Sequence, residues 1–408
     1  MENLKLIGKN KFSKDSKFLL ICDLMYSTTG IFVNTFLVAY FLEITNESIV
    51  QVSIFYMIIY SLLCLVSLLL GNFVKNNPQH MTKLLSFGTF LRALFILLIV
   101  VLKEKIATYF PLVAILYAIA EAFYWTAHEI LLINVTTNEN RKDYNSLETI
   151  FSRIIEIIVP IILGASIELS SFSKIAIYVF VISLIQIMAS LKITNDIKFK
   201  NEKIEKYSIS NFIKSLDKEA KTKIKTFVKS MVAFGVVESS TGTLVVIITI
   251  MTFKTSLNLG VLTSIFYLCS MLSLYLYKKY YTPKNSKFVL YSCASLILIS
   301  VIGLIFDINK TTLIIYNFLY TVTIVILNVI YNTKKGNLVK ECNIEKWKIE
   351  YLAFVEIYIA IGRVLGYLLM LIAGILNNLI IFKVLLVVVA IFAPIYAKLM
   401  YKIEKDNA

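Results

Sequence analysis

Twelve long apolar segments, separated by polar connections, follow one another along this chain of 408 residues. Each is at least as long as the roughly 20 residues that an α-helix needs to cross about 30 Å of hydrocarbon. The segments cover residues 18–42, 48–73, 83–103, 109–134, 144–168, 172–192, 226–252, 256–277, 287–307, 311–333, 348–376 and 378–401. This pattern predicts an all-α membrane protein that crosses the bilayer twelve times.

Lysine and arginine are concentrated in every second connection between these segments. The alternate connections contain few basic residues, whereas clusters lie in residues 5–17, 75–83, 141–142, 192–225, 278–287, 334–348 and 398–405. Because the cytoplasmic loops of membrane proteins carry the excess of lysine and arginine, both termini are predicted to be cytoplasmic.

The overall composition separates this chain from soluble proteins. Hydrophobic residues make up 58% of the sequence, above the roughly 45–50% of soluble domains. A net charge of +15 would suggest nucleic acid binding in a soluble chain, but here the basic residues lie in loops that face anionic lipids. We therefore expect membrane lipids, and no nucleic acid, as partners. The first apolar segment is too long for a cleaved signal peptide.

Residues for catalysis or metal binding are scarce. The sequence has two histidines and five cysteines, and no cysteine pair has the short spacing of a zinc site or a disulfide framework. It has no glycine-rich phosphate loop and no serine, histidine and aspartate arrangement of a hydrolase. We expect no cofactor, no metal and no enzymatic activity, so a gradient or a partner must drive the work of this protein.

The longest polar stretch, residues 194–225, divides the spans into two sets of six. It predicts an N-terminal bundle of residues 1–193 and a C-terminal bundle of residues 226–408, joined by a cytoplasmic loop. Apolar residues recur at helical spacing within this loop, at Ile209, Phe212, Ile213, Leu216 and Ala220. The spacing predicts an amphipathic helix on the inner membrane surface, and a simple tether is the alternative.

The two halves share short sequence matches at equivalent places. Ser53-Ile54-Phe55-Tyr56 in the second span corresponds to Ser264-Ile265-Phe266-Tyr267 in the eighth. Gly30 follows a Ser-Thr-Thr run in the first span as Gly242 follows Ser-Thr in the seventh, and Asn-Val pairs end the fourth and tenth spans. The matches favour a duplicated six-helix unit with pseudo-symmetric halves.

Six plus six helices, a basic central loop, cytoplasmic ends and a parallel repeat resemble the major facilitator superfamily over residues 15–403. Locally, three segments are similar to poorly characterised bacterial members that are grouped with exporters: residues 27–37, 123–125 and 137–145. The resemblance implies a monomeric secondary transporter of the bacterial plasma membrane, with spans one, four, seven and ten around a central cavity. In the loop after span two, Lys75 stands where the family has an aspartate.

Ionisable residues within the spans are candidates for function, because each charge costs on the order of 2.5–3.5 kcal/mol at the membrane centre. They are Asp23, Arg92, Glu121, His128, Glu129, Arg153, Glu156, Glu238, Glu356 and Arg363. Six acids stand against three arginines, and this surplus disfavours an anionic substrate and suits a proton or a cation. Structural ion pairs are the alternative, especially for Arg92, Glu156 and Arg363.

The fourth span contains the main candidate cluster. One of its faces carries a carboxylate, an imidazole and aromatic rings at helical spacing: Tyr117, Glu121, Tyr124, Trp125 and His128. Because only a short loop joins spans four and five, Glu121 is expected at the depth of Arg153 and Glu156. We therefore predict that these three residues form one cluster.

Two roles follow for the candidates. For proton coupling we predict Glu121 as the main carboxylate, tuned by Arg153, with Asp23 and Glu156 as further members. For substrate binding the candidates are Tyr124, Trp125, His128, Glu238, Asn34, Asn317, Tyr320 and Arg363. The sequence thus predicts export of a lipophilic or cationic small molecule against protons by alternating access. Uptake or flipping of an anionic solute or lipid, an enzyme, and an accessory protein without transport are the alternatives.

Overall fold

The computed structural model describes residues 12–136, 141–194 and 206–405, and helices make up nearly all of them. In the first half, one span runs through α2 (Lys14–Ile31), a π-helical turn η2 (Phe32–Leu37) and α3 (Val38–Ile44). The other five spans of this half are α4 (Ile49–Asn76), α5 (Met81–Leu102), α6 (Ile106–Val135), α7 (Arg141–Leu169) and α8 (Phe172–Leu191).

The second half begins with a short helix, α9 (Ile209–Ser215), and continues with six long helices. These are α10 (Lys218–Phe253), α11 (Ser256–Tyr280), α12 (Ser286–Phe306), α13 (Lys310–Glu341), α14 (Lys348–Leu376) and α15 (Leu379–Lys405). Among the described residues, eleven segments are long and apolar enough to cross a membrane. One of them, Pro78–Leu132, is 55 residues long and contains both α5 and most of α6, so the twelve predicted spans correspond to eleven such segments.

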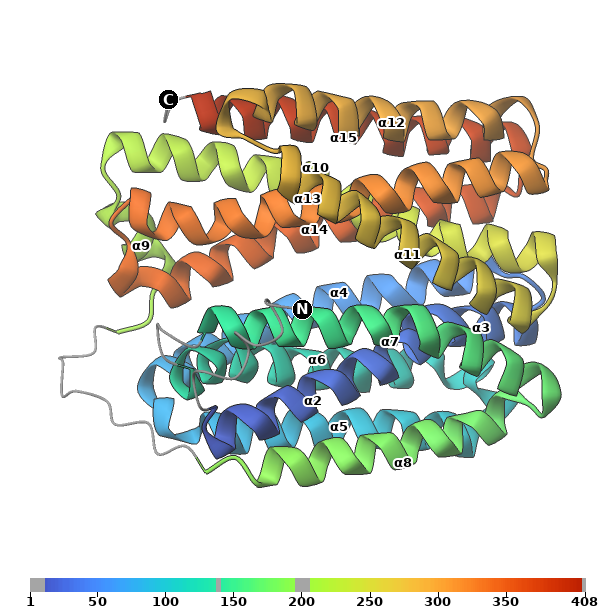
Figure 1. The fold of residues 1–408 in the computed structure, drawn as a ribbon, viewed down its shortest axis with the longest axis horizontal. Helices are drawn as coiled ribbons and strands as arrows, with labels where there is room; N and C mark the ends of the chain where they lie inside the picture. Colours follow the sequence, from blue (N-terminus) through green and yellow to red (C-terminus); the bar gives the residue numbers. More distant parts are fainter. Residues whose placement is uncertain (1–11, 137–140, 195–205, 406–408) are drawn as a thin grey trace.

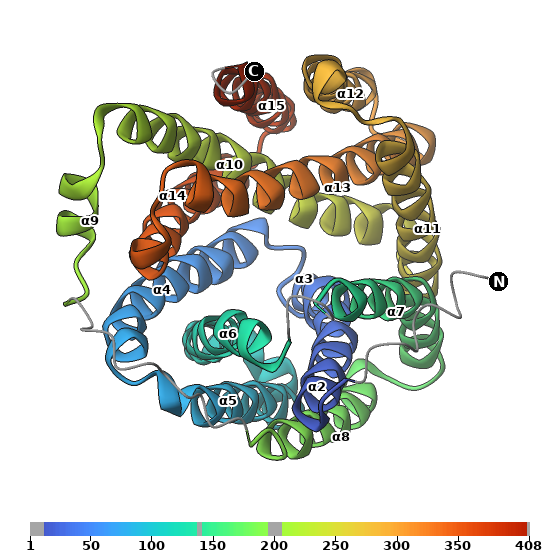
Figure 2. The same cartoon turned by 60° about the vertical axis from the view of Figure 1, so that its left-hand side comes forward.

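The helices form two six-helix bundles that lie against each other (Figure 1). Each bundle packs mainly within itself, and the largest contacts between the bundles join α4 to α14 and α7 to α11 (Figure 2). This arrangement confirms the predicted all-α fold of two six-helix halves.

The connection between the halves differs from the sequence prediction. The apolar spacing predicted one amphipathic helix over residues 209–220, but α9 ends at Ser215 and Leu216 is extended. The Asp217 side chain then accepts a hydrogen bond from the backbone N–H of Ala220 at 2.7 Å, which caps a new helix, α10. The seventh span therefore begins at Lys218 rather than at residue 226. Residues 195–205 lie outside the described part of the chain.

Helix α9 packs on protein. The Phe212 ring is fully buried, with ring centroids 6.5 Å from Trp347, 6.3 Å from Tyr351 and 6.1 Å from Phe354. Just before α9, burial and the charge of Glu350 raise the pKa of Tyr207 to about 12. The segment that the sequence placed on the membrane surface thus docks its main apolar side chain against the start of α14.

The two halves meet differently at their two ends. At the end far from α9, backbones touch: a Cβ atom on Gly260 of α11 would lie 2.2 Å from the Pro160 carbonyl oxygen of α7. At the α9 end, side chains make the connection, because Lys75 of α4 pairs with Glu350 of α14. Glycine therefore permits a close helix crossing at one end, and charged side chains join the halves at the other.

Candidate functional site

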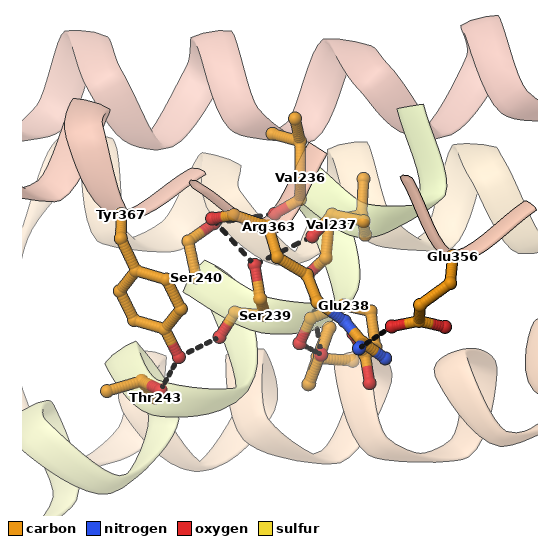
Figure 3. Close-up of polar contacts among 11 residues, drawn as sticks. Val236, Val237, Glu238, Ser239, Ser240, Thr243, Glu356, Arg363 and Tyr367 are labelled. Atoms are coloured by element: carbon orange, nitrogen blue, oxygen red, sulfur yellow. Dashed lines mark hydrogen bonds and ion pairs between the residues drawn. The ribbon is translucent and has the colours of Figure 1, made fainter. Parts of the chain in front are cut away.

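The first charged cluster lies between α10 and α14 in the second half. Arg363, near the middle of α14, donates from Nε to Glu238 Oε2 on α10 at 3.0 Å (Figure 3). Its Nη1 lies 3.6 Å from Glu356 Oε1, and Glu356 shares a face of α14 with Arg363 because the two are seven residues apart. One guanidinium is thus held between two carboxylates.

Close packing of the two helices fixes this cluster in place. A Cβ atom on Gly362 would lie 2.2 Å from the Val232 carbonyl oxygen, so only glycine allows α14 to come this near to α10. One turn further along α14, the Tyr367 hydroxyl bonds with the Thr243 hydroxyl at 2.6 Å and donates to the Ser239 carbonyl at 3.2 Å (Figure 3). These contacts set the register of Arg363 against Glu238.

The first half contributes an aromatic ring to the same cluster. The Arg363 guanidinium carbon lies 4.9 Å from the centroid of the Tyr60 ring on α4, a cation–π contact. Tyr60 and Tyr56 both stack on Tyr367, with centroids 5.7 Å and 4.9 Å away. Side chains from both halves therefore surround Arg363.

A second cluster lies in the first half around Glu121 of α6. Its carboxylate pairs with Arg92 of α5, and it accepts hydrogen bonds from the Tyr26 hydroxyl at 2.5 Å and from Trp125 Nε1 at 3.1 Å. The Arg92 guanidinium also lies 3.8 Å from the centroid of the Tyr26 ring. Arg92 is completely buried, whereas Trp125 is 43% exposed. The cluster thus has a buried charged interior and an exposed aromatic face.

This geometry corrects the predicted cluster of Glu121, Arg153 and Glu156. Arg153 donates to Glu156 at 2.5 Å on its own helix, while the partner of Glu121 is Arg92. A structural ion pair was the alternative prediction for Arg92. The close approach of α5 to α6 comes from the tertiary structure: a Cβ atom on Gly88, one turn before Arg92, would lie 2.6 Å from the Tyr124 backbone nitrogen.

A third cluster surrounds Asp23 of α2. His128 Nε2 lies 2.7 Å from Asp23 Oδ1, and the hydroxyls of Tyr144 and Tyr124 donate to the same carboxylate at 2.8 Å and 3.1 Å. Tyr124 also stacks on Tyr26 with centroids 4.5 Å apart. The Asp23 cluster is therefore in contact with the Glu121 cluster through two aromatic rings. Tyr144 was absent from the predicted set, because nothing in its sequence spacing relates it to Asp23.

The remaining predicted residues differ in their accessibility. Asn34 is exposed within the π-helical turn η2, a feature that is frequent at functional sites. Asn317 is fully buried and donates to the Thr249 hydroxyl at 2.8 Å. Tyr320 is 5% exposed and donates to the Glu238 carbonyl at 3.1 Å. Of these three, only Asn34 presents its side chain to a solute in this state.

In the described residues, no three histidine, cysteine, aspartate or glutamate side chains are grouped as metal ligands. The clusters therefore consist of ion pairs, hydroxyls and aromatic rings.

The sequence profile of the Major Facilitator Superfamily matches residues 19–339. The chain belongs to this superfamily. It is a secondary transporter and not an enzyme, as the sequence predicted. No curated protein sequence matches this transporter.

Several solved structures share its fold. A bacterial homologue of the iron transporter ferroportin, in an inward-facing state, is 12% identical with a TM-score of 0.67, over 97% of this chain and 100% of that one. A peptide transporter POT in complex with sulfate is 9% identical with a TM-score of 0.70, over 96% and 95%. The nucleoside transporter NupG is 11% identical with a TM-score of 0.67, over 96% and 98%. At these identities the likeness shows the fold.

In this superfamily member, the three candidate arginines Arg92, Arg153 and Arg363 are each paired with a carboxylate. The pairs are Arg92 with Glu121, Arg153 with Glu156, and Arg363 with both Glu238 and Glu356. The predicted surplus of three acids is distributed over three places: the cluster around Arg363 has two carboxylates for one guanidinium, Asp23 lies beside His128, and Glu129 lies 3.8 Å from Lys335.

Proposed function

We propose that this transporter exports a cationic or lipophilic small molecule in exchange for protons. The observation that carries the proposal is the position of Arg363 between Glu238 and Glu356. With all three groups ionised, the cluster has a net charge of minus one, which attracts a cation and repels an anion. The rival proposal, an anionic solute or lipid held by Arg153 and Arg363, needs a guanidinium without a carboxylate partner, and both are paired.

The aromatic residues of the first half suit the organic part of such a substrate. Trp125 is 43% exposed although it lies well inside the apolar helix α6. Its indole N–H is already occupied by Glu121 and by the Tyr26 hydroxyl at 3.0 Å, so its exposed surface is mainly the ring. A flat or apolar substrate would bury that ring, at roughly 25 cal/mol for each Å² removed from water.

Glu121 is the proposed coupling carboxylate, with Arg92 in the tuning role that the sequence gave to Arg153. Its carboxylate contacts three donors: Arg92, Tyr26 and Trp125. In this proposal, transfer of a proton to Glu121 accompanies a rearrangement of these donors between the states of the transport cycle. A substrate that packs on Trp125 and a proton on Glu121 would then favour different states, which is the requirement for exchange.

The Asp23 cluster is a second proton site in this proposal. It contacts the Glu121 cluster through the stacked rings of Tyr124 and Tyr26, and it holds the imidazole of His128. Histidine is the side chain whose ordinary titration range includes neutral pH, so this cluster is suited to exchange protons with water.

The orientation of the transporter follows from its basic connections. We assign the α9 end to the cytoplasm of a bacterial cell, since the basic start of α10 and the basic segments after α4 and α11 lie there. A membrane potential then contributes about 2.3 kcal/mol for each charge moved across 100 mV, so no nucleotide is needed.

The decisive experiment is proton-driven transport of a fluorescent organic cation by inverted vesicles. Glu121→Gln is expected to abolish transport driven by a pH gradient while preserving exchange of substrate for substrate, because the substitution removes the proton site but keeps hydrogen bonding. Because Glu156 pairs with Arg153 on its own helix and not with Glu121, this proposal gives it no coupling role. Glu156→Gln is therefore the matched control and should keep its pH dependence. If Glu121→Gln retains full pH-dependent transport and Asp23→Asn loses it, the coupling site lies on α2 and the assignment to Glu121 is wrong.

A further inference from the structure

The guanidinium of Arg363 is held in the way that a protein holds a bound organic cation. It donates from Nε to Glu238 at 3.0 Å, lies with Nη1 3.6 Å from Glu356, and faces the Tyr60 ring at 4.9 Å. Carboxylates at the edge of a flat cation and an aromatic ring at its face are the groups that recognise guanidinium. Glu238 and Glu356 come from two helices of one half, α10 and α14 (Figure 3). Tyr60 comes from α4 of the other half.

The other two intramembrane arginines do not share this setting. Arg92 is completely buried, so no solute can reach its place in this state. Arg153 pairs with Glu156 three residues further along the same helix, an arrangement that holds one side chain against its own helix. Unlike Arg92, the side chains of Arg363, Glu238 and Glu356 are partly exposed, at 19%, 28% and 30%, about as much as the Arg153 and Glu156 side chains at 25% and 24%. A solute can therefore contact the carboxylates around Arg363.

We propose that Arg363 is a built-in placeholder for the substrate, and that the substrate carries a flat, delocalised cation of the guanidinium or amidinium class. This inference rests on the proposed function only in that both assign substrate binding to the Arg363 cluster. Two carboxylates can form ion pairs with two cations. The incoming cation takes over Glu356 and the face of Tyr60, where Arg363 has its longer contacts, while Arg363 keeps its hydrogen bond to Glu238.

The charge balance favours this exchange of partners. The unloaded cluster has a net charge of minus one, and binding of one cation brings it to zero without leaving any group unpaired. A compact, strongly hydrated ion such as sodium cannot both pair with Glu356 and stack on the Tyr60 ring, whereas a planar guanidinium can. Because Tyr60 belongs to the first half, the bound cation would contact both halves, and Tyr60 becomes a residue that determines specificity.

Removal of the placeholder gives a direct test on the purified full chain. Arg363→Ala is expected to melt at a lower temperature than the wild type, because Glu238 and Glu356 lose their cation. Low-millimolar guanidinium chloride should then raise the melting temperature of the variant by about 3 °C when guanidinium is present at ten times its dissociation constant. Urea, which has a similar flat shape and no charge, and sodium chloride at equal ionic strength should produce no such rise.

Three further variants make the result specific. Arg153→Ala is the matched control, and guanidinium should not stabilise it more than sodium does, because the ion pair of Arg153 is with one carboxylate, Glu156, on its own helix. Glu356→Gln in the Arg363→Ala background should abolish the guanidinium effect. Arg363→Gln replaces Arg363→Ala if the alanine variant does not fold, since an amide retains a hydrogen-bond donor for Glu238.

Two outcomes would overturn the inference. If sodium stabilises Arg363→Ala as much as guanidinium does, the cluster responds to charge alone. If guanidinium has no effect on a folded Arg363 variant, the cluster is a structural ion pair. Because these measurements need no proton gradient, they can fail while proton-coupled export of another cation holds, and they can succeed while Glu121→Gln disproves the coupling assignment.

Discussion

Breaking the ion pair between Lys75 and Glu350 is expected to destabilise the protein strongly. Substitution of Lys75 should cost more than substitution of Glu350. Lys75 lies in the last turn of α4 and Glu350 in the first turn of α14, so the pair joins the two halves at the α9 end. The side chains are only 9% and 0% exposed, and the Lys75 ammonium also lies 5.0 Å from the centroid of the Trp347 ring.

The magnitude follows from which charge is left without a partner. Lys75→Met leaves a fully buried carboxylate, and breaking a buried pair in this way costs about 3–5 kcal/mol. The cost is at the upper end because Glu350 Oε2 already lacks a hydrogen-bond partner among the described residues. Glu350→Gln leaves an ammonium on a flexible stem that can turn toward water, so we expect only about 1–2 kcal/mol.

A double-mutant cycle measures this coupling. Lys75→Met combined with Glu350→Gln leaves no buried charge, so the double variant should recover most of the loss, with an interaction energy of about 2 kcal/mol or more. Unfolding in detergent can be followed by tryptophan fluorescence in a Trp125→Phe background, because the chain has two tryptophans and Trp347 lies against the pair. If the two single effects simply add, or if Lys75→Met has no cost, the reasoning from burial is refuted.

Three more predictions concern packing, orientation and reactivity. Gly260→Ala should destabilise the crossing of α7 and α11 by about 1–3 kcal/mol and so lower the melting temperature. Gly336→Ala is the control and should not lower it, because a Cβ atom there meets nothing within 4 Å. Equal effects of the two substitutions would contradict the close crossing. If the α9 end is cytoplasmic, an impermeant maleimide should label Asn46→Cys, an exposed position between α3 and α4, in intact cells. It should not label Ser210→Cys, an exposed position in α9. The opposite result would reverse the orientation. Burial raises the pKa of the Cys342 thiol to about 11. Its alkylation at neutral pH should therefore be about a hundredfold slower than that of an unperturbed cysteine. Comparable rates would contradict that burial.

The sequence by itself determined the architecture of this protein. The number of spans, their division into two sets of six and the family all follow from apolar segment lengths and loop charges, which are local properties of the chain. Helix ends were less accurate where a helix continues beyond the apolar segment. Asp217 caps α10 and Glu341 ends α13, so both helices extend past the predicted spans of 226–252 and 311–333.

The partners of the charged residues were decided by the tertiary structure. Helical periodicity places Glu121, Trp125 and His128 on one face, but it does not say which neighbouring helix that face meets. The choice of Arg92 over Arg153 depends on how closely α5 packs on α6, and Gly88 makes that approach possible.

The same physical reason applies to the second half. Glu238 and Arg363 are 125 residues apart in sequence, yet they lie within hydrogen-bond distance because Gly362 brings α14 against α10. A charged side chain within the membrane is stabilised by pairing with an opposite charge inside the protein, because the surrounding hydrocarbon contains no charged groups. The sequence therefore shows which residues need partners, and only the packing of the helices decides which partners they find.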